Sequence, residues 1–281
     1  MYQTLMDCQT LSRYLDDPAV VVVDCRFDLM QPQAGRAAYF QGHIPGAVYA
    51  DLNTDLSAPV TPVSGRHPLP DPTRFAQQLG RWGISNISQV VVYDAGNGGY
   101  AVRLWWLLRW LGHQAVALLD GGLAAWQGTG LPISSAILQP VVTRFEFELQ
   151  SGSDLSMEQV RAGLQQGTIC LVDARTAARY AGEVEPIDPV AGHIPTALNY
   201  PFEANLDDSG RFLNAEQLRM RFASLASQPE RVVHMCGSGV TACHNLLAME
   251  VAGLVGSKLY AGSWSEWVRD PKNPVTKGYA A

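Results

Sequence analysis

The sequence VVVVDCR (Val20–Arg26) decides the fold, because it returns near the middle of the chain as ICLVDAR (Ile169–Arg175). The block GHIP also occurs twice, first at Gly42–Pro45 and again at Gly192–Pro195. Blocks that recur in the same order at a long, nearly constant spacing indicate a duplicated structural unit. The chain is therefore predicted to hold two copies of one domain.

Two later blocks extend the repeat. VVY at Val91–Tyr93 matches VVH at Val232–His234, and Gly121 matches Gly262, each with a tryptophan five positions further on. The GHIP blocks lie 150 positions apart, whereas these later blocks lie 141 apart. The first copy therefore carries nine extra residues between the early and the late blocks.

Each copy alternates short β-branched runs with longer helical patterns, as in Val90–Tyr93 followed by Ala101–Leu111. Alternating strands and helices favour a mainly parallel sheet flanked by helices on both faces. We therefore expect an α/β protein of two tandem domains, at residues 1–131 and 153–281. The stretch 132–152 is rich in Ser, Pro and β-branched residues and has no counterpart in the repeat, so it is predicted to be a linker.

The composition is that of a globular protein, with 47% hydrophobic and 16% charged residues among 281. A net charge of −6 disfavours binding to the phosphate backbone of a nucleic acid. The start of the chain lacks a basic region and a long apolar core, so a cytoplasmic location is expected. Arg109 and His113 interrupt the most apolar stretch, Leu104–Leu119, which favours a buried helix and strand over a membrane segment.

The five cysteines, at positions 8, 25, 170, 236 and 243, are odd in number and irregularly spaced. Without an export signal they are expected to be free thiols. None forms a short pair with metal-ligand spacing, so no metal site is predicted. Cys8, Cys25 and Cys170 are interpreted as small buried hydrophobic residues, and Cys243 as a packing residue in a helix.

Cys236 is different, because it opens a glycine-rich turn between a predicted strand, RVVHM (Arg231–Met235), and a predicted helix, Ala242–Val251. The turn reads Cys236-Gly237-Ser238-Gly239-Val240-Thr241. Its glycines let backbone N–H groups turn inward around one point, and these amides together with the positive end of the helix stabilise a thiolate. A reactive role is predicted for Cys236. The first copy aligns Ala95 with it and so lacks a nucleophile.

Protein tyrosine phosphatases also place a cysteine in such a turn. Phosphoryl transfer needs an arginine that holds the phosphate oxygens. In the phosphatase loop this arginine stands six residues after the cysteine, where the present chain has Ala242. Since no residue of the turn is charged, phosphatase activity is disfavoured.

The sequence CGSGVTA (Cys236–Ala242) resembles the active-site loop of the 3-mercaptopyruvate sulfurtransferases, a branch of the rhodanese superfamily. The two GHIP blocks, LDGG (Leu119–Gly122) with Trp126, and a first copy without a nucleophile are also features of that family. The resemblance covers nearly the whole chain. It implies two tandem rhodanese-like domains, of which the second is catalytic.

In this family the cysteine thiolate takes the outer sulfur of a donor as a persulfide and releases pyruvate or sulfite. A thiol, a reduced thioredoxin or cyanide then removes the sulfur, and neither a metal nor an organic cofactor is needed. The resemblance implies this role for Cys236. A rhodanese-fold module that only binds partners is disfavoured, because such modules commonly lose the cysteine. A monomer is expected, since the tandem repeat supplies its own second domain.

The preferred donor is predicted from the charged residues. Thiosulfate-preferring relatives typically have two basic residues after the cysteine, whereas Gly237 and Ser238 stand here and suit 3-mercaptopyruvate. Arg179 matches the family arginine that holds the anionic group of the donor; the alternative is a surface arginine. The second arginine that often follows a Glu-Pro-Glu-Pro stretch is absent from EVEPIDP (Glu183–Pro189). Thiosulfate therefore remains the alternative donor.

The family further has a serine, histidine and aspartate relay that is proposed to handle protons. Ser238 matches the serine, and His67 matches the histidine from the expanded part of the first copy, where it could reach the other domain. The aspartate aligns best with Asn53, which can orient a histidine but cannot stabilise its cation. The alternatives are a helix-capping serine and a loop-bracing histidine. His43 and His193, which both GHIP blocks contain, are predicted to have structural roles in turns.

Overall fold

The computed structural model describes residues 1–279, which form two compact units. Unit 1 comprises Met1–Ala58, Leu69–Gln150 and Asp208–Phe212. Unit 2 comprises Pro59–Pro68, Ser151–Asp207 and the chain from Leu213 onward. The short segment Pro59–Pro68 thus groups with the second copy of the repeat, although it lies within the first copy in sequence. The domain limits at 131 and 153 stay a prediction from the sequence.

The five-stranded sheet of unit 1 has the order β1-β5-β4-β2-β3, and all neighbouring strands are parallel. Its strands are β1 (Leu5–Met6), β2 (Val20–Asp24), β3 (Val48–Tyr49), β4 (Gln89–Tyr93) and β5 (Val116–Leu119). Its helices are α1 (Cys8–Ser12), α2 (Ala34–Gln41), α3 (Pro72–Arg81), α4 (Ala101–Trp110) and α5 (Gly122–Gly128). The apolar stretch Leu104–Leu119 forms most of α4 and all of β5, so a buried helix followed by a strand is confirmed.

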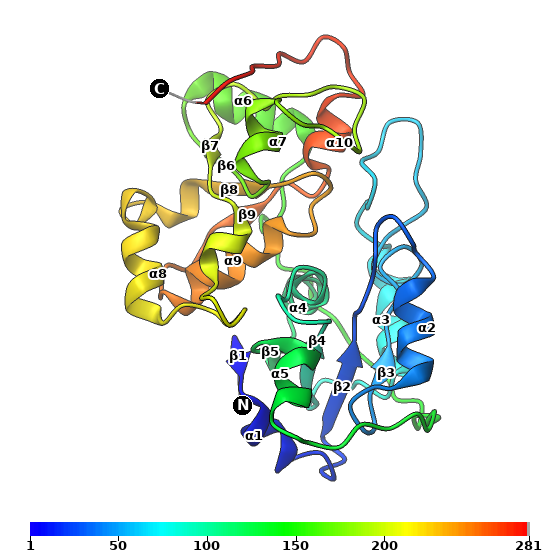
Figure 1. Cartoon of the computed structure of the whole chain (residues 1–281). Helices are drawn as coiled ribbons and strands as arrows, with labels where there is room; N and C mark the ends of the chain where they lie inside the picture. The colour runs from blue at the N-terminus through cyan, green and yellow to red at the C-terminus, as the bar shows by residue number, and fades with distance from the viewer. Residues whose placement is uncertain (280–281) are drawn as a thin grey trace. The chain divides into compact units, whose positions relative to one another are not determined.

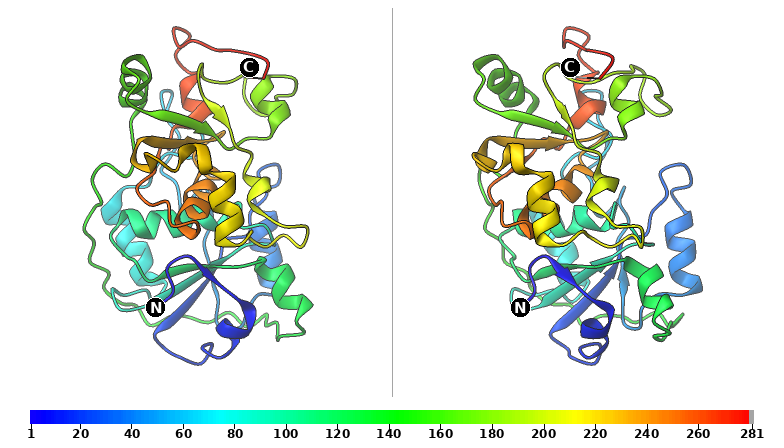
Figure 2. Two further views of the ribbon diagram at one scale, coloured as in Figure 1. Left: turned by 90° about the vertical axis from the view of Figure 1, so that its left-hand side faces the viewer. Right: turned by 60° about the vertical axis from the view of Figure 1, so that its left-hand side comes forward.

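The four-stranded sheet of unit 2 has the order β7-β6-β8-β9, again with parallel neighbours only. Its strands are β6 (Cys170–Asp173), β7 (Leu198–Asn199), β8 (Val232–Met235) and β9 (Lys258–Leu259). Its helices are α6 (Met157–Gln166), α7 (Ala177–Ala181), α8 (Ala215–Arg221), α9 (Ala242–Val251) and α10 (Ser263–Trp267), with short 3-10 turns at Phe202–Asn205, Ala223–Leu225 and Pro229–Arg231. Figures 1 and 2 show α6, α7 and α10 on one side of this sheet and α8 and α9 on the other. The predicted parallel sheet flanked by helices is confirmed.

Within each sheet, the two central strands are paired in the same way: β2 with β4 in unit 1, and β6 with β8 in unit 2. Asp24 of β2 pairs with Tyr93 of β4, and its repeat equivalent Asp173 of β6 pairs with Met235 of β8. The β-branched residues of these central strands are buried because helices cover both faces of a parallel sheet. Tyr93 and Met235 are therefore structurally equivalent, which fixes how the loops after β4 and β8 correspond.

Within residues 1–279, none of the helices combines the length and the apolar character that a membrane-spanning segment requires.

Candidate active site

The Cys236 loop joins β8 to α9, and α10 anchors its first residues. The Cys236 N–H donates to Ser263 Oγ at 3.1 Å, and the Cys236 carbonyl accepts from the Trp264 N–H at 3.1 Å. The Gly237 carbonyl accepts from the Ser265 N–H at 2.9 Å. Cys236 is only 2% exposed. The thiol is therefore held in one place before the N-terminus of α9, where the helix dipole favours an anion.

Gly239 gives the loop its turn. Its φ is +73°, a value that side-chain-bearing residues rarely adopt, and a Cβ there would lie 2.3 Å from the carbonyl oxygen of Ala261. After the turn, the carbonyls of Val240 and Thr241 accept hydrogen bonds, each at 3.1 Å, from N–H groups of the first turn of α9. The predicted strand–turn–helix is therefore present around Cys236.

Unit 1 contains the corresponding loop with an anion already in it. By strand register the residue equivalent to Cys236 is Asp94, not Ala95 as the sequence alignment suggested, because the loop 94–100 is one residue longer than the loop 236–241. The Asp94 carboxylate accepts hydrogen bonds from four backbone N–H groups, those of Gly96 (3.1 Å), Gly98 (2.9 Å), Tyr100 (2.9 Å) and Ala101 (3.2 Å). Neither Asp94 nor Ala95 is a nucleophilic thiol, so the first copy still lacks one.

Ser238 and His67 contact each other within unit 2. The His67 Nδ1 lies 2.7 Å from Ser238 Oγ, and both residues are buried. The segment Pro59–Pro68 lies against the start of α10: a Cβ on Gly65 would lie 2.5 Å from the carbonyl oxygen of Gly262, and the Arg66 N–H donates to Ser265 Oγ at 3.0 Å. Two of the predicted site residues are thereby brought together beside the Cys236 loop.

Asn53, the proposed counterpart of the relay aspartate, belongs to unit 1. Its backbone N–H donates to Asp51 Oδ1 at 2.9 Å, and the Asp51 N–H donates to Asp55 Oδ2 at 2.8 Å. The two flanking carboxylates thus brace the backbone turn that carries Asn53. A relay through Asn53 stays a prediction.

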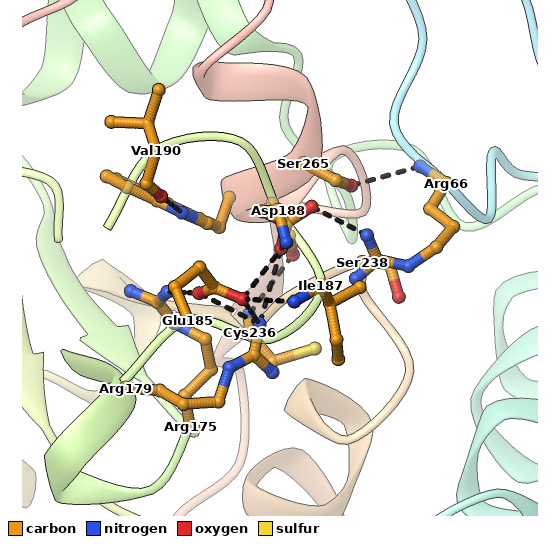
Figure 3. A network of polar contacts seen from close by, with 12 residues as sticks. Arg66, Arg175, Arg179, Glu185, Ile187, Asp188, Val190, Cys236, Ser238 and Ser265 are labelled. Atoms are coloured by element: carbon orange, nitrogen blue, oxygen red, sulfur yellow. Dashed lines mark hydrogen bonds and ion pairs between the residues drawn. The ribbon is translucent and has the colours of Figure 1, made fainter. Parts of the chain in front are cut away.

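Arg179, on α7, belongs to a network of ion pairs (Figure 3). Its Nη2 lies 2.8 Å from Glu185 Oε1 and 3.3 Å from Asp188 Oδ2, and its side chain is 18% exposed. Arg175 also contacts Glu185, at 3.4 Å, and pairs with Asp173 at 2.7 Å. Burial alone would raise the pKa of Glu185, but hydrogen bonds from the Asp188 N–H and Arg179 outweigh it and lower this pKa. Glu185 is therefore an ionised brace for both arginines.

Arg66 completes this network, and no motif in the sequence pointed to it. Its Nη1 lies 2.6 Å from Asp188 Oδ1, and its backbone N–H donates to Ser265 Oγ at 3.0 Å (Figure 3). A Cβ on Gly237 would lie 3.1 Å from Arg66 Nη2 and 3.5 Å from Arg179 Nη1. Two cations therefore lie beside a loop that carries no charge itself. The one feature of the sequence that could have indicated a role for Arg66 is that it directly precedes His67.

The other four cysteines, like Cys236, form no disulfide bond within residues 1–279. Burial raises the pKa of the Cys8, Cys25 and Cys170 thiols, which disfavours the reactive thiolate there. Cys243 lies in α9 and donates to the Gly239 carbonyl at 3.5 Å. Cys8, Cys25 and Cys243 are buried, as their predicted packing roles require, whereas Cys170 at the start of β6 is only partly buried, contrary to the prediction. Within residues 1–279, no group of three or more His, Cys, Asp or Glu side chains is arranged to hold a metal ion.

His43 and His193 occupy equivalent turns. The Nδ1 of His43 lies 2.8 Å from the Tyr39 carbonyl, and the Nδ1 of His193 lies 2.9 Å from the Tyr180 carbonyl. Each imidazole also stacks on the ring of the same tyrosine, with centroids 4.1 Å and 3.7 Å apart. Because the same bracing occurs in the copy without a nucleophile, it is a structural feature of the repeat.

Comparison with known proteins agrees with this architecture. The rhodanese-like domain family matches residues 7–129 and 156–270. The chain is 50% identical, over 98% of both chains, to a protein of Pseudomonas aeruginosa named "Probable 3-mercaptopyruvate sulfurtransferase". It is 33% identical, over 99% of its length and 97% of the relative, to the thiosulfate sulfurtransferase of Rattus norvegicus. The crystal structure of the 3-mercaptopyruvate sulfurtransferase SseA from Escherichia coli matches with a TM-score of 0.82 at 33% identity, covering 94% of this chain and 100% of that one. The chain therefore belongs to the rhodanese family as a two-domain sulfurtransferase.

Proposed function

We propose that this enzyme transfers sulfur from 3-mercaptopyruvate to an acceptor through a persulfide on Cys236. The observation that carries the proposal is the Cys236 loop, in which a buried thiol occupies the position of the Asp94 carboxylate in the other copy. Four backbone amides hold the anion in that copy, and a loop of this design suits a thiolate or a persulfide anion. The 50% identity to a relative named for 3-mercaptopyruvate supports the choice of donor.

The proposed first step is attack of the Cys236 thiolate on the sulfur of the donor. A sulfur–sulfur bond forms, the carbon–sulfur bond breaks, and its electron pair leaves with the three-carbon fragment as an enolate. The enolate takes up a proton and departs as pyruvate. Ser238, with His67 at 2.7 Å, is the proposed path for that proton.

In the second step an acceptor thiolate attacks the outer sulfur of the persulfide. The sulfur–sulfur bond breaks, and its electron pair returns to Cys236 as the thiolate. A small thiol, a reduced thioredoxin or cyanide would each serve as the acceptor. The steps need no metal or organic cofactor.

Thiosulfate is the second candidate donor. The pair of arginines beside Gly237 favours it, because a dianion gains more than a monoanion from two nearby cations. The similarity to a rat thiosulfate sulfurtransferase also supports it. A module that only binds partners is set aside, because the relatives are enzymes and Cys236 is present.

A monomeric state is expected because one chain already holds both copies of the domain, and light scattering coupled to size-exclusion chromatography checks it. A cytoplasmic location is proposed because all five cysteines are free thiols. Cell fractionation with an antibody to the protein tests this location.

Steady-state sulfur transfer to one common thiol acceptor tests the choice of donor. We expect kcat/KM to be higher with 3-mercaptopyruvate than with thiosulfate, and no transfer from either donor with Cys236→Ala. A higher kcat/KM with thiosulfate would make that compound the donor and would show that the charge of the loop residues alone does not set the preference.

A further inference from the structure

Two guanidinium groups, those of Arg66 and Arg179, lie next to Gly237. A Cβ at this glycine would lie 3.1 Å from Arg66 Nη2, 3.5 Å from Arg179 Nη1 and 3.7 Å from Arg179 Nη2. Gly237 directly follows Cys236 in the loop. The two cationic ends therefore converge on the space next to the candidate nucleophile, one from α7 and one from the segment Pro59–Pro68.

The same two arginines have hydrogen-bond donors left over. Arg66 donates from Nη1 and Arg179 from Nη2, while the Nε of each is buried without a partner among residues 1–279. Buried N–H groups normally find an acceptor, and leaving one without costs free energy. The Nη2 of Arg66 and the Nη1 of Arg179 face Gly237 and donate no hydrogen bond within residues 1–279, so these are the atoms that a bound anion would contact.

Asp188 fixes the two arginines relative to each other. Its Oδ1 accepts a hydrogen bond from Arg66 Nη1 at 2.6 Å, and its Oδ2 accepts one from Arg179 Nη2 at 3.3 Å (Figure 3). The Asp188 side chain is 3% exposed. The Asp188 N–H donates in turn to Glu185 Oε1 at 3.0 Å. The guanidinium groups are thus held in place before any ligand arrives, which lowers the ordering cost of binding.

We propose that Arg66 and Arg179 form one anion clamp beside Cys236, with Asp188 as the residue that positions it. The clamp binds the carboxylate of 3-mercaptopyruvate or the sulfonate end of thiosulfate. Arg66 provides the second cation, which the loop and the stretch Glu183–Pro189 lack. The absence of a side chain at Gly237 keeps the space for the anion open. The inference rests on the proposed function and names the residue that governs donor affinity.

Kinetics of Arg66→Gln and Arg66→Lys test the clamp with each donor in turn. Arg66→Gln is expected to raise KM about ten- to a hundredfold while kcat changes less than about threefold, because a charged hydrogen bond to the donor is lost. Arg66→Lys should recover part of the affinity, since it keeps the charge but loses the planar fork. Arg161→Gln is the matched control. Arg161 lies on α6 of the same unit and pairs with Asp270 at 3.1 Å, so its loss should leave KM unchanged.

Gly237→Ala gives an independent test that changes no charge. The added methyl group would displace the ends of Arg66 and Arg179, so KM should rise several-fold with an unchanged thermal unfolding temperature. An unchanged KM in both Arg66→Gln and Gly237→Ala would overturn the clamp. So would a fall of kcat and of the unfolding temperature at constant KM, because that pattern indicates a structural role for Arg66.

Binding without turnover separates this inference from the proposed function. In Cys236→Ser, thiosulfate should raise the unfolding temperature with increasing concentration, and the additional change Arg66→Gln should abolish the rise. An equal rise in both variants would refute the clamp even if sulfur transfer occurs. A rise that depends on Arg66, in a protein whose wild type forms no persulfide, would support the clamp and refute the proposed function.

Discussion

The residues of the Cys236 loop carry no charge, whereas Arg66 and Arg179, which lie beside it, come from other segments of the chain. Cys236, Ser238 and Arg179 could be predicted because the motif around each is local in sequence. Arg66 could not be predicted in the same way, because its place beside Gly237 depends on how the segment Pro59–Pro68 folds against the start of α10. The sequence therefore indicated Arg179 as a cation of the site but did not indicate Arg66.

The contact between Ser238 and His67 predicts a role in turnover. His67→Ala should lower the turnover of 3-mercaptopyruvate about a hundredfold, because the proposed proton path is lost. Ser238→Ala should have a similar effect, and the double variant should be no worse than either single one, as expected for groups that act as a unit. Steady-state kinetics of the three variants decide the matter. Turnover that survives in His67→Ala would leave the pair a bracing contact.

The repeat in the sequence predicts the strands and helices of both copies, but it does not predict how the loops after β4 and β8 align. The alternation of β-branched runs and helical patterns predicted both parallel sheets correctly, since burial on two faces demands it. The sequence alignment placed Ala95 opposite Cys236, because the run of valines at Val90–Val92 lets VVY match VVH one position out of register. Strand register and hydrogen bonds identify Asp94 instead.

Asp94 is therefore predicted to stabilise unit 1. Asp94→Ala would leave four backbone N–H groups without their acceptor, at a cost of about 3 to 5 kcal/mol in the free energy of unfolding. Asp94→Asn keeps the shape and part of the hydrogen bonding, so its loss should be smaller. Urea unfolding followed by circular dichroism measures both variants. A loss below about 1 kcal/mol for Asp94→Ala would show that the loop does not depend on the anion.

The whole molecule carries two versions of one loop, and they differ in what occupies the anion position. Unit 1 fills it with the Asp94 carboxylate, whereas unit 2 places the Cys236 thiol there. In the proposed account, one copy is stabilised by its own anion and the other is left open for chemistry.

The stability of the molecule should depend on pH through His234 of β8. Burial lowers the pKa of this imidazole from 6.5 to about 3. The unfolded chain binds a proton below about pH 6.5 while the folded chain does not, so stability falls as the pH drops from 6.5 toward 3. This residue should cost about 2 kcal/mol between pH 7 and pH 5. His234→Leu should therefore flatten the pH dependence of urea unfolding, whereas identical curves for variant and wild type would contradict a neutral buried imidazole.

The intact mass of the protein after brief incubation with 3-mercaptopyruvate and no acceptor tests directly whether Cys236 carries the sulfur. We expect a mass increase of one sulfur atom, located at Cys236 by peptide mapping, reversed by a thiol and absent from Cys236→Ala. An added sulfur on another cysteine, or turnover in a protein that never gains one, would contradict a persulfide on Cys236.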